Sequence, residues 1–206
     1  LMLVAPDTSP RNTGIIGEAD VWEFGAGAGF YLDATQAPWS KHFRMHDYVV
    51  NELPALIGAH FAADTTRSGI CGHSMGGHGA LTIALKHPGR YRSVSAFAPI
   101  VAPGEVPWGH KALPRFLGED RSTWTAYDSC ALLAAGHRFD GEILVDQGEA
   151  DKFLATQLQP ERLEAACAAS GQPLRLRRHA GYDHSYWFIQ SFIEEHLEHH
   201  AAAVRA

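Results

Sequence analysis

The sequence predicts an α/β fold with a mostly parallel sheet and helices on both faces. Short apolar runs rich in β-branched residues alternate with longer segments of helical periodicity, which is the pattern of a parallel sheet that is covered on both sides. A chain of 206 residues with 46% hydrophobic and 19% charged residues is sufficient for one domain with a substantial core. We therefore expect a single domain over residues 1–206.

Five segments are predicted strands and four are predicted helices. The strands are residues 1–5, 68–72, 93–98, 142–147 and 174–178, and the helices are residues 39–61, 75–86, 160–170 and 186–199. Pro54 is expected to kink the first helix or to begin a new first turn, and Gly171 is a plausible C-cap of the third. Because Leu1 opens directly into an apolar run without an initiating Met, we expect the chain to begin inside a domain.

Two long irregular segments separate these elements, residues 8–38 and 99–123. Both are rich in Gly, Pro and aromatic residues, and loops of that length in a compact domain are usually functional or disordered. Since their aromatic side chains can bury much surface, we expect ordered loops that line a pocket.

Composition and charge exclude several classes of function. The net charge is −6 with scattered Lys and Arg, so we expect no nucleic-acid partner. The three cysteines, Cys71, Cys130 and Cys167, lack CxxC spacing, which argues against disulfides or a zinc site and favours the reducing cytoplasm. No apolar run approaches the roughly 20 residues of a membrane span, so we expect a soluble protein with no membrane association.

The most specific motif is GxSxG at Gly72–Gly76, with Ser74 between a predicted strand and a predicted helix. A nucleophilic serine on such a tight turn needs small residues two positions before and after it, because strand and helix backbones crowd together there. This nucleophile elbow is typical of the α/β-hydrolase fold. The alternative is a glycine-rich turn with an incidental serine.

A serine nucleophile needs a carboxylate and a histidine, which follow it in that order in α/β-hydrolases. The loop after strand 142–147 offers Asp151, which is our candidate acid. Glu149 could substitute for it, whereas Asp146 lies inside the strand, where we expect packing or a local hydrogen bond. The loop after strand 174–178 offers His184 as the base, selected by position and order among 13 histidines.

Supporting roles around Ser74, Asp151 and His184 are assigned to three further residues. Asp183 is predicted to be a turn or cap residue, and His73 is predicted either to line the pocket or to pack beside the elbow. The oxyanion of the tetrahedral intermediate needs two donors, one of which is the backbone N–H after the nucleophile, here that of Met75. The second donor is expected upstream of the residues of this chain.

Two other histidine groups are interpreted as exposed surface. His42 and His46 have i, i+4 spacing but lack the glutamate of HExxH, so a solvated helix face is favoured over a metal site. His196, His199 and His200 are interpreted as an exposed helix end.

Many stretches together resemble one family, the S-formylglutathione hydrolases of the esterase D group. The matching residues span nearly the whole chain: 6–10 (PDTSP), 27–31 (GAGFY), 34–39 (ATQAPW), 48–54 (YVVNELP), 72–80 (GHSMGGHGA), 107–109 (PWG), 117–120 (LGED), 146–148 (DQG), 151–154 (DKFL) and 182–188 (YDHSYWF).

The resemblance implies a function that the composition does not reveal. It implies that Ser74, Asp151 and His184 are the catalytic triad, and that the enzyme hydrolyses the thioester S-formylglutathione to formate and glutathione in formaldehyde detoxification. No metal or organic cofactor is needed, Trp108 is a possible wall for the glutathione arm, and a homodimer is plausible.

The chain departs from the family in one respect that leaves alternatives open. Members of the family carry N-terminal strands and an oxyanion loop of the type Leu-Ser-Gly-Leu-Thr-Cys, which this sequence lacks. The alternatives are a carboxylesterase or acyltransferase on the same scaffold, or an inactive fragment.

Overall fold

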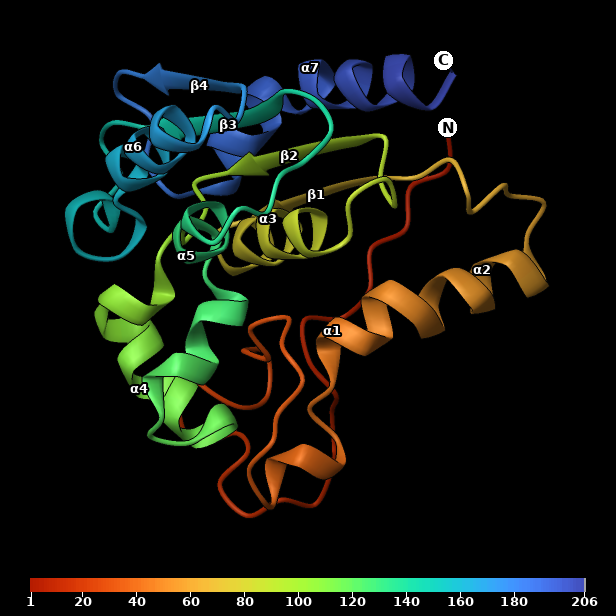
Figure 1. The fold of residues 1–206 in the computed structure, drawn as a ribbon. Coiled ribbons are helices and arrows are strands. Elements are labelled where there is room, and N and C mark those ends of the chain that lie inside the picture. Colours follow the sequence, from red (N-terminus) through yellow and green to blue (C-terminus); the bar gives the residue numbers. More distant parts are fainter. Residues whose placement is uncertain (206) are drawn as a thin grey trace.

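The core of the structure is a four-stranded, fully parallel sheet (Figure 1). The computed structural model describes residues 1–205. The strands lie side by side in chain order: β1 (Gly69–His73), β2 (Ser93–Phe97), β3 (Ile143–Gly148) and β4 (Leu174–His179). Four of the five predicted strands are thus confirmed, and all four end at the same edge of the sheet.

The prediction of a strand at residues 1–5 is wrong. These residues form no ladder with any described strand, and Leu1 and Leu3 are about two-thirds exposed, at 68% and 69%. An apolar run with β-branched residues becomes a strand only when a neighbouring strand accepts and donates its backbone hydrogen bonds.

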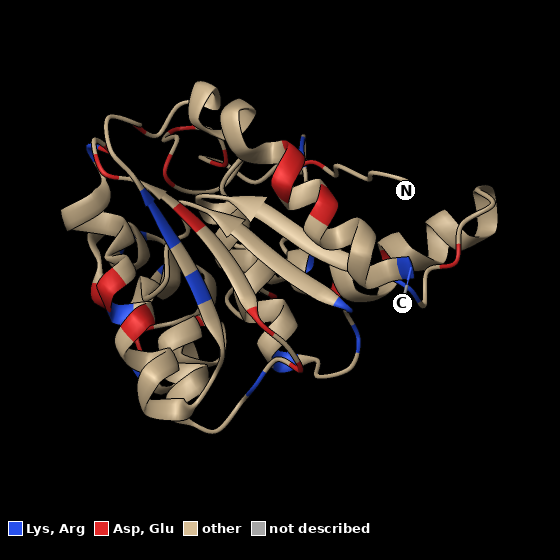
Figure 2. Ribbon diagram, turned by 90° about the horizontal axis from the view of Figure 1, so that it is seen from above, with Lys and Arg blue, Asp and Glu red and all other residues tan. Residues whose placement is uncertain are grey.

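Helices cover both faces of the sheet, as Figures 1 and 2 show from two directions. On one face lie α3 (Met75–Lys86), α5 (Ser129–Ala134) and α6 (Pro160–Ser170), and on the other lies α7 (Tyr186–Arg205). Alternation along the strands explains this arrangement: Val94 and Ala96 pack with α3, α5 and α6, whereas Phe97 packs edge-on against Phe188 of α7. Helix α6 ends at Gly171, which has the left-handed conformation expected of the C-cap.

The helix predicted over residues 39–61 is divided into shorter elements. They are a 3₁₀ turn (Trp39–Lys41), α1 (Met45–Asp47), a π-helical turn (Tyr48–Glu52) and α2 (Leu53–His60). Pro54 lies in the first turn of α2, where its missing N–H would have no helical partner in any case.

The two long segments are ordered, as predicted. In residues 8–38, Phe24, Phe30 and Leu32 are at most 3% exposed. Residues 99–123 were expected to be irregular, but they contain α4 (Pro107–Leu117), whose first-turn proline and buried Trp108, Leu113 and Phe116 stabilise it. The other short helices are 3₁₀ turns at Pro103–Glu105 and Arg121–Tyr127 and a π-helical turn at Leu154–Leu158.

No helix within residues 1–205 combines the length and the apolar character needed to cross a membrane.

Candidate active site

Ser74 lies on a strained turn between β1 and α3. Its φ and ψ angles are 56° and −115°, a conformation that costs a non-glycine residue free energy and that clusters at functional sites. Its N–H donates to the carbonyl of Phe97 on β2 at 2.8 Å. The neighbouring strand therefore holds the serine at the carboxyl edge of the sheet.

The glycine requirement of this turn falls on one side of the serine. A Cβ at Gly72 would lie 2.1 Å from the carbonyl oxygen of Gly76, whereas a Cβ at Gly76 would meet only the Tyr31 hydroxyl, at 3.9 Å. The expectation of small residues on both sides is confirmed for Gly72 only. The close approach involves the backbone of Gly76, which any residue has.

At this edge Asp151 and His184 are joined by a hydrogen bond of 2.5 Å between Oδ2 and Nδ1. Asp151 follows β3 and its side chain is fully buried. Its other carboxylate oxygen accepts the backbone N–H of Phe153 at 2.8 Å. Because a carboxylate can only accept, Nδ1 of His184 carries the proton and Nε2 is left as the basic nitrogen.

His73 connects this pair to the elbow. Its ring lies 4.4 Å from that of His184, and it immediately precedes Ser74. Burial, reinforced by the nearby charge of His184, lowers the pKa of His73 to about 4, so His73 is neutral near pH 7. The structure thus brings His184 to the elbow, although within residues 1–205 no hydrogen bond joins its ring to the Ser74 hydroxyl.

The other carboxylates considered from the sequence form no hydrogen bond with His184 in the described part of the chain. Asp146 is fully buried and accepts two hydrogen bonds of 2.6 Å from the guanidinium of Arg177, which confirms its expected role in local bonding. Asp183 accepts the N–H of Ser185, as expected of a turn residue. Glu149 is exposed.

Met75 is the first residue of α3. Its N–H donates to no backbone carbonyl in the described part of the chain, so it is available to an anion at the helix N-terminus.

Aromatic side chains line one side of the Asp151–His184 pair. The His184 ring lies 5.1 Å from Phe153, and Phe153 lies 4.7 Å from Trp108 at the start of α4. Trp108, the predicted wall, is 7% exposed and contacts Trp22 at 5.6 Å. Both long segments therefore contribute aromatic side chains near the pair, and their role in lining a substrate pocket stays a prediction.

The interpretation of two histidine groups as exposed surface is wrong. The side chain of His46 is only 11% exposed, and its Nε2 lies 3.1 Å from Nε2 of His87. His196 and His200 are buried: His196 bonds Ser95 and Asp146, and His200 bonds Ser93 and Ser95. Phe192 and Ile193 precede His196 at helical spacing, and this apolar periodicity is the one sequence indication that could have revealed the burial of His196.

No group of three or more His, Cys, Asp or Glu side chains within residues 1–205 could hold a metal ion. Cys71, Cys130 and Cys167 are all free.

Comparisons with known proteins identify the family of this chain. A family model described as "Putative esterase" matches residues 1–199. An S-formylglutathione hydrolase of Arabidopsis thaliana is 53% identical over 99% of this chain and 72% of its own length, and one of Mus musculus is 53% identical over 100% and 73%. A solved S-formylglutathione hydrolase from Agrobacterium tumefaciens superimposes with a TM-score of 0.93, at 54% identity over 97% of this chain and 72% of that one.

The parallel sheet, the strained serine and the esterase match define an esterase with the α/β-hydrolase fold. Within that class, the identity over nearly its whole length means that this chain belongs to the family of the S-formylglutathione hydrolases.

Proposed function

We propose that this chain hydrolyses S-formylglutathione to formate and glutathione, with Ser74 as nucleophile, His184 as general base and acid, and Asp151 as the residue that orients His184. The observation that carries the proposal is the 2.5 Å bond between Asp151 and His184 beside the strained Ser74, in a chain 53% identical to enzymes of that name.

In the first half of the reaction, Nε2 of His184 takes the proton of the Ser74 hydroxyl as its oxygen attacks the formyl carbon. Asp151 stabilises the resulting imidazolium because its carboxylate accepts the Nδ1–H. The Met75 N–H is one donor to the oxyanion. The carbon–sulfur bond then breaks, and glutathione leaves as its thiol after taking the proton from His184.

In the second half, water attacks the formyl ester on Ser74. His184 takes the proton of that water and returns it to the serine oxygen as formate leaves, which restores the resting enzyme. His73 stays neutral throughout, because its pKa is about 4, and so adds no positive charge beside the imidazolium.

Turnover of S-formylglutathione compared with that of an aryl acetate tests the proposal. We expect a kcat/KM for S-formylglutathione at least about tenfold above that for the acetate, since only the thioester presents the glutathione arm to the pocket. Ser74→Ala is the control that defines the background. Equal rates for wild type and Ser74→Ala, or a strong preference for the acetate, would overturn the proposal.

A cytoplasmic location and a homodimeric assembly remain predictions. The cytoplasmic prediction rests on the cysteines, all three of which are free. Burial raises the pKa of Cys130 to about 12, so its thiol is protonated and unreactive at neutral pH. Fractionation of the source cells and sedimentation of the purified protein test the two predictions directly.

A further inference from the structure

A second strained turn lies against the helix that follows Ser74. Phe30 and Tyr31 have φ angles of 50° and 49°, in the left-handed region that costs a non-glycine residue roughly 1–2 kcal/mol. Such residues persist only where the surrounding structure holds them, and they cluster at functional sites. These two residues, the strained turn, take no part in the chemistry of the proposed mechanism, so their strain needs another explanation.

Tyr31 packs along the face of α3 where two glycines leave room for it. A Cβ at Gly79 would lie 2.5 Å from Cγ of Tyr31, and a Cβ at Gly76 would lie 3.9 Å from the Tyr31 hydroxyl oxygen. The two glycines are three residues apart and therefore share one face of the helix. The Tyr31 side chain thus runs along α3 toward the elbow, and position 79 has to be glycine in order to admit its ring.

His78 joins the strained turn to the elbow by two hydrogen bonds. Its backbone N–H donates to the carbonyl of Ser74 at 2.9 Å. Its ring is fully buried, and Nε2 lies 3.0 Å from the carbonyl oxygen of Phe30. Because a carbonyl can only accept, Nε2 carries the proton. Burial lowers the pKa of His78 to about 4, so the ring is neutral near pH 7 and this donor does not change with pH there.

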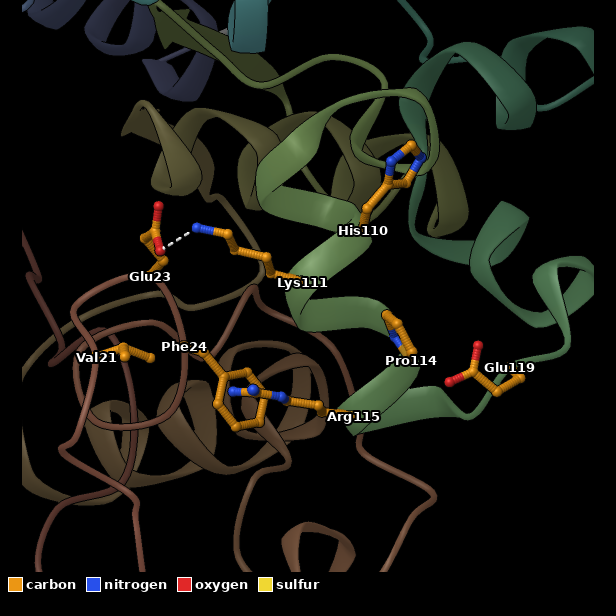
Figure 3. Close-up of a pocket in the computed structure, with 8 residues that line it drawn as sticks. All are labelled: Val21, Glu23, Phe24, His110, Lys111, Pro114, Arg115 and Glu119. Carbon is orange, nitrogen blue, oxygen red and sulfur yellow. Dashed lines mark hydrogen bonds and ion pairs between the residues drawn. The ribbon is translucent and has the colours of Figure 1, made fainter.

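The segment that carries the strained turn is itself anchored on α4 (Figure 3). Glu23 and Lys111 form an ion pair at 2.6 Å, which the figure shows as a dashed line. The Arg115 guanidinium lies over the ring of Phe24, 4.8 Å from its centroid, and Phe24 is buried. The strained turn therefore belongs to a segment that α4 holds in place, and its contacts with α3 fix that helix in turn.

We propose that His78 is a positioning residue for the nucleophile: its ring bond to Phe30 fixes the first turn of α3, and with it the direction of the Ser74 side chain. Both peptide groups of Ser74 are bonded, its N–H to Phe97 and its carbonyl to His78. A shift of α3 therefore turns Ser74, and a misplacement of about 1 Å can cost about 10²-fold in rate. The inference rests on the proposed function, because it explains how the proposed nucleophile is held.

Substitutions that remove or keep the donor of His78 test the inference. His78→Leu leaves the Phe30 carbonyl without its donor, and we expect kcat for an aryl acetate to fall at least about tenfold. KM should change less than about twofold, because His78 is fully buried and meets no substrate. His78→Gln carries an amide N–H near the position of Nε2 and should restore most of kcat. His200→Leu is the matched control, since it removes a buried histidine that bonds Ser93 and Ser95 instead, and it should lower stability without lowering kcat.

Gly79→Ala tests the same link from the side of the strained turn. Its methyl group meets the Tyr31 ring, so the turn has to move away from α3, and kcat should fall as it does in His78→Leu. Alanine favours a helix over glycine by up to about 1 kcal/mol, so a weaker helix does not explain that loss. This variant also decides the question if His78→Leu does not fold.

Amide hydrogen exchange separates this inference from the proposed function, because it needs no turnover. In His78→Leu and Gly79→Ala the amides of residues 74–78 should exchange at least about tenfold faster than in the wild type, while those of β3 and β4 keep their rates. Faster exchange confined to the elbow, and reversed in His78→Gln, supports the inference even if the wild type fails to hydrolyse S-formylglutathione. Unchanged elbow exchange in both variants, an unchanged kcat, or a loss that His78→Gln does not restore would overturn it, even if the wild type hydrolyses the thioester well.

Discussion

Within residues 1–205 we compare two groups of serine, histidine and aspartate, of which we propose that one is the nucleophilic site. The first is Ser74, His184 and Asp151 at the carboxyl edge of the sheet. The second is Ser95, His196 and Asp146 between the sheet and α7, where His196 bonds the serine at 2.8 Å and the aspartate at 3.2 Å. The hydrogen bonds alone would favour the second group.

The setting of each group explains the difference. Ser74 has a positive φ on a strained turn, whereas Ser95 belongs to a regular strand and is fully buried. Asp151 is bonded to His184 and the backbone, whereas Asp146 is neutralised by the bidentate Arg177. We therefore expect a strained serine at the edge of the sheet, and an aspartate bound only to the histidine and the backbone, to distinguish a reactive triad from a structural one.

The largest effect is expected from a substitution that distinguishes Ser74 from Ser95. Ser74→Ala should lower kcat for ester hydrolysis by on the order of 10⁶-fold and abolish labelling by a serine-directed phosphonate. Ser95→Ala should keep the labelling, because a buried serine within the sheet does not reach a substrate. Retained labelling in Ser74→Ala would reverse our assignment of the two groups.

The two aspartates should separate catalysis from stability. Asp151→Asn is expected to lower kcat by about 10⁴-fold, since an amide favours the wrong tautomer of His184, with little change in unfolding. Asp146→Asn removes the buried anion beside His196 and leaves Arg177 with Glu195 as its one remaining carboxylate among the described residues, which should cost about 3 kcal/mol in the free energy of unfolding. Urea denaturation of both variants beside kcat checks this, and a catalytic loss confined to Asp146→Asn would contradict it.

Acid is expected to destabilise the fold by protonating the buried Asp146. Burial raises the pKa of Asp146, but hydrogen bonds from His196 and Arg177 outweigh that effect and hold the pKa at about 2. Because this folded-state pKa lies below the ordinary value near 4, ionised Asp146 stabilises the fold above pH 4 by about 2 kcal/mol.

That contribution is lost as the pH falls from about 4 to about 2. The free energy of unfolding of the wild type should therefore decrease more steeply over this interval than that of Asp146→Asn. Parallel curves for the two proteins would exclude Asp146 as the source of the acid sensitivity.

The sequence pattern singles out the proposed triad but not the buried group of Ser95, His196 and Asp146, and the reason is physical. Ser74, Asp151 and His184 each occupy a turn or loop after a strand, and such positions can be read from local patterns. The periodicity of α7 indicates that His196 faces the apolar side, but its bonds to Ser95 and Asp146 depend on how α7 packs across the sheet, which no local pattern encodes. Residues 1–5 illustrate the same limit, because strand formation depends on a partner elsewhere in the chain.

A smaller effect should follow from disturbing the elbow alone. Gly72→Ala places a methyl group 2.1 Å from the Gly76 carbonyl oxygen, so strand and helix have to move apart and Ser74 shifts. We expect kcat to fall by about 10²-fold. Gly76→Ala is the matched control, with ordinary contact to Tyr31 and a helix propensity up to about 1 kcal/mol better than that of glycine. An equal loss in both variants would indicate a general sensitivity of α3 rather than strain at the elbow.

The smallest effect is expected at His73, which contacts the reactive histidine without a bond to it. Its pKa of about 4 means that it binds no proton above pH 5, so one ionisation should describe the acid limb of kcat/KM there. His73→Asn should leave that limb in place and change kcat by less than about tenfold, since it removes packing against His184 but no charge. A slope of two protons in the acid limb of kcat/KM for the wild type, together with a slope of one proton for His73→Asn, would show that His73 takes part in the titration. The neutral neighbour would then be part of the proton chemistry of the triad instead of a support for its ring.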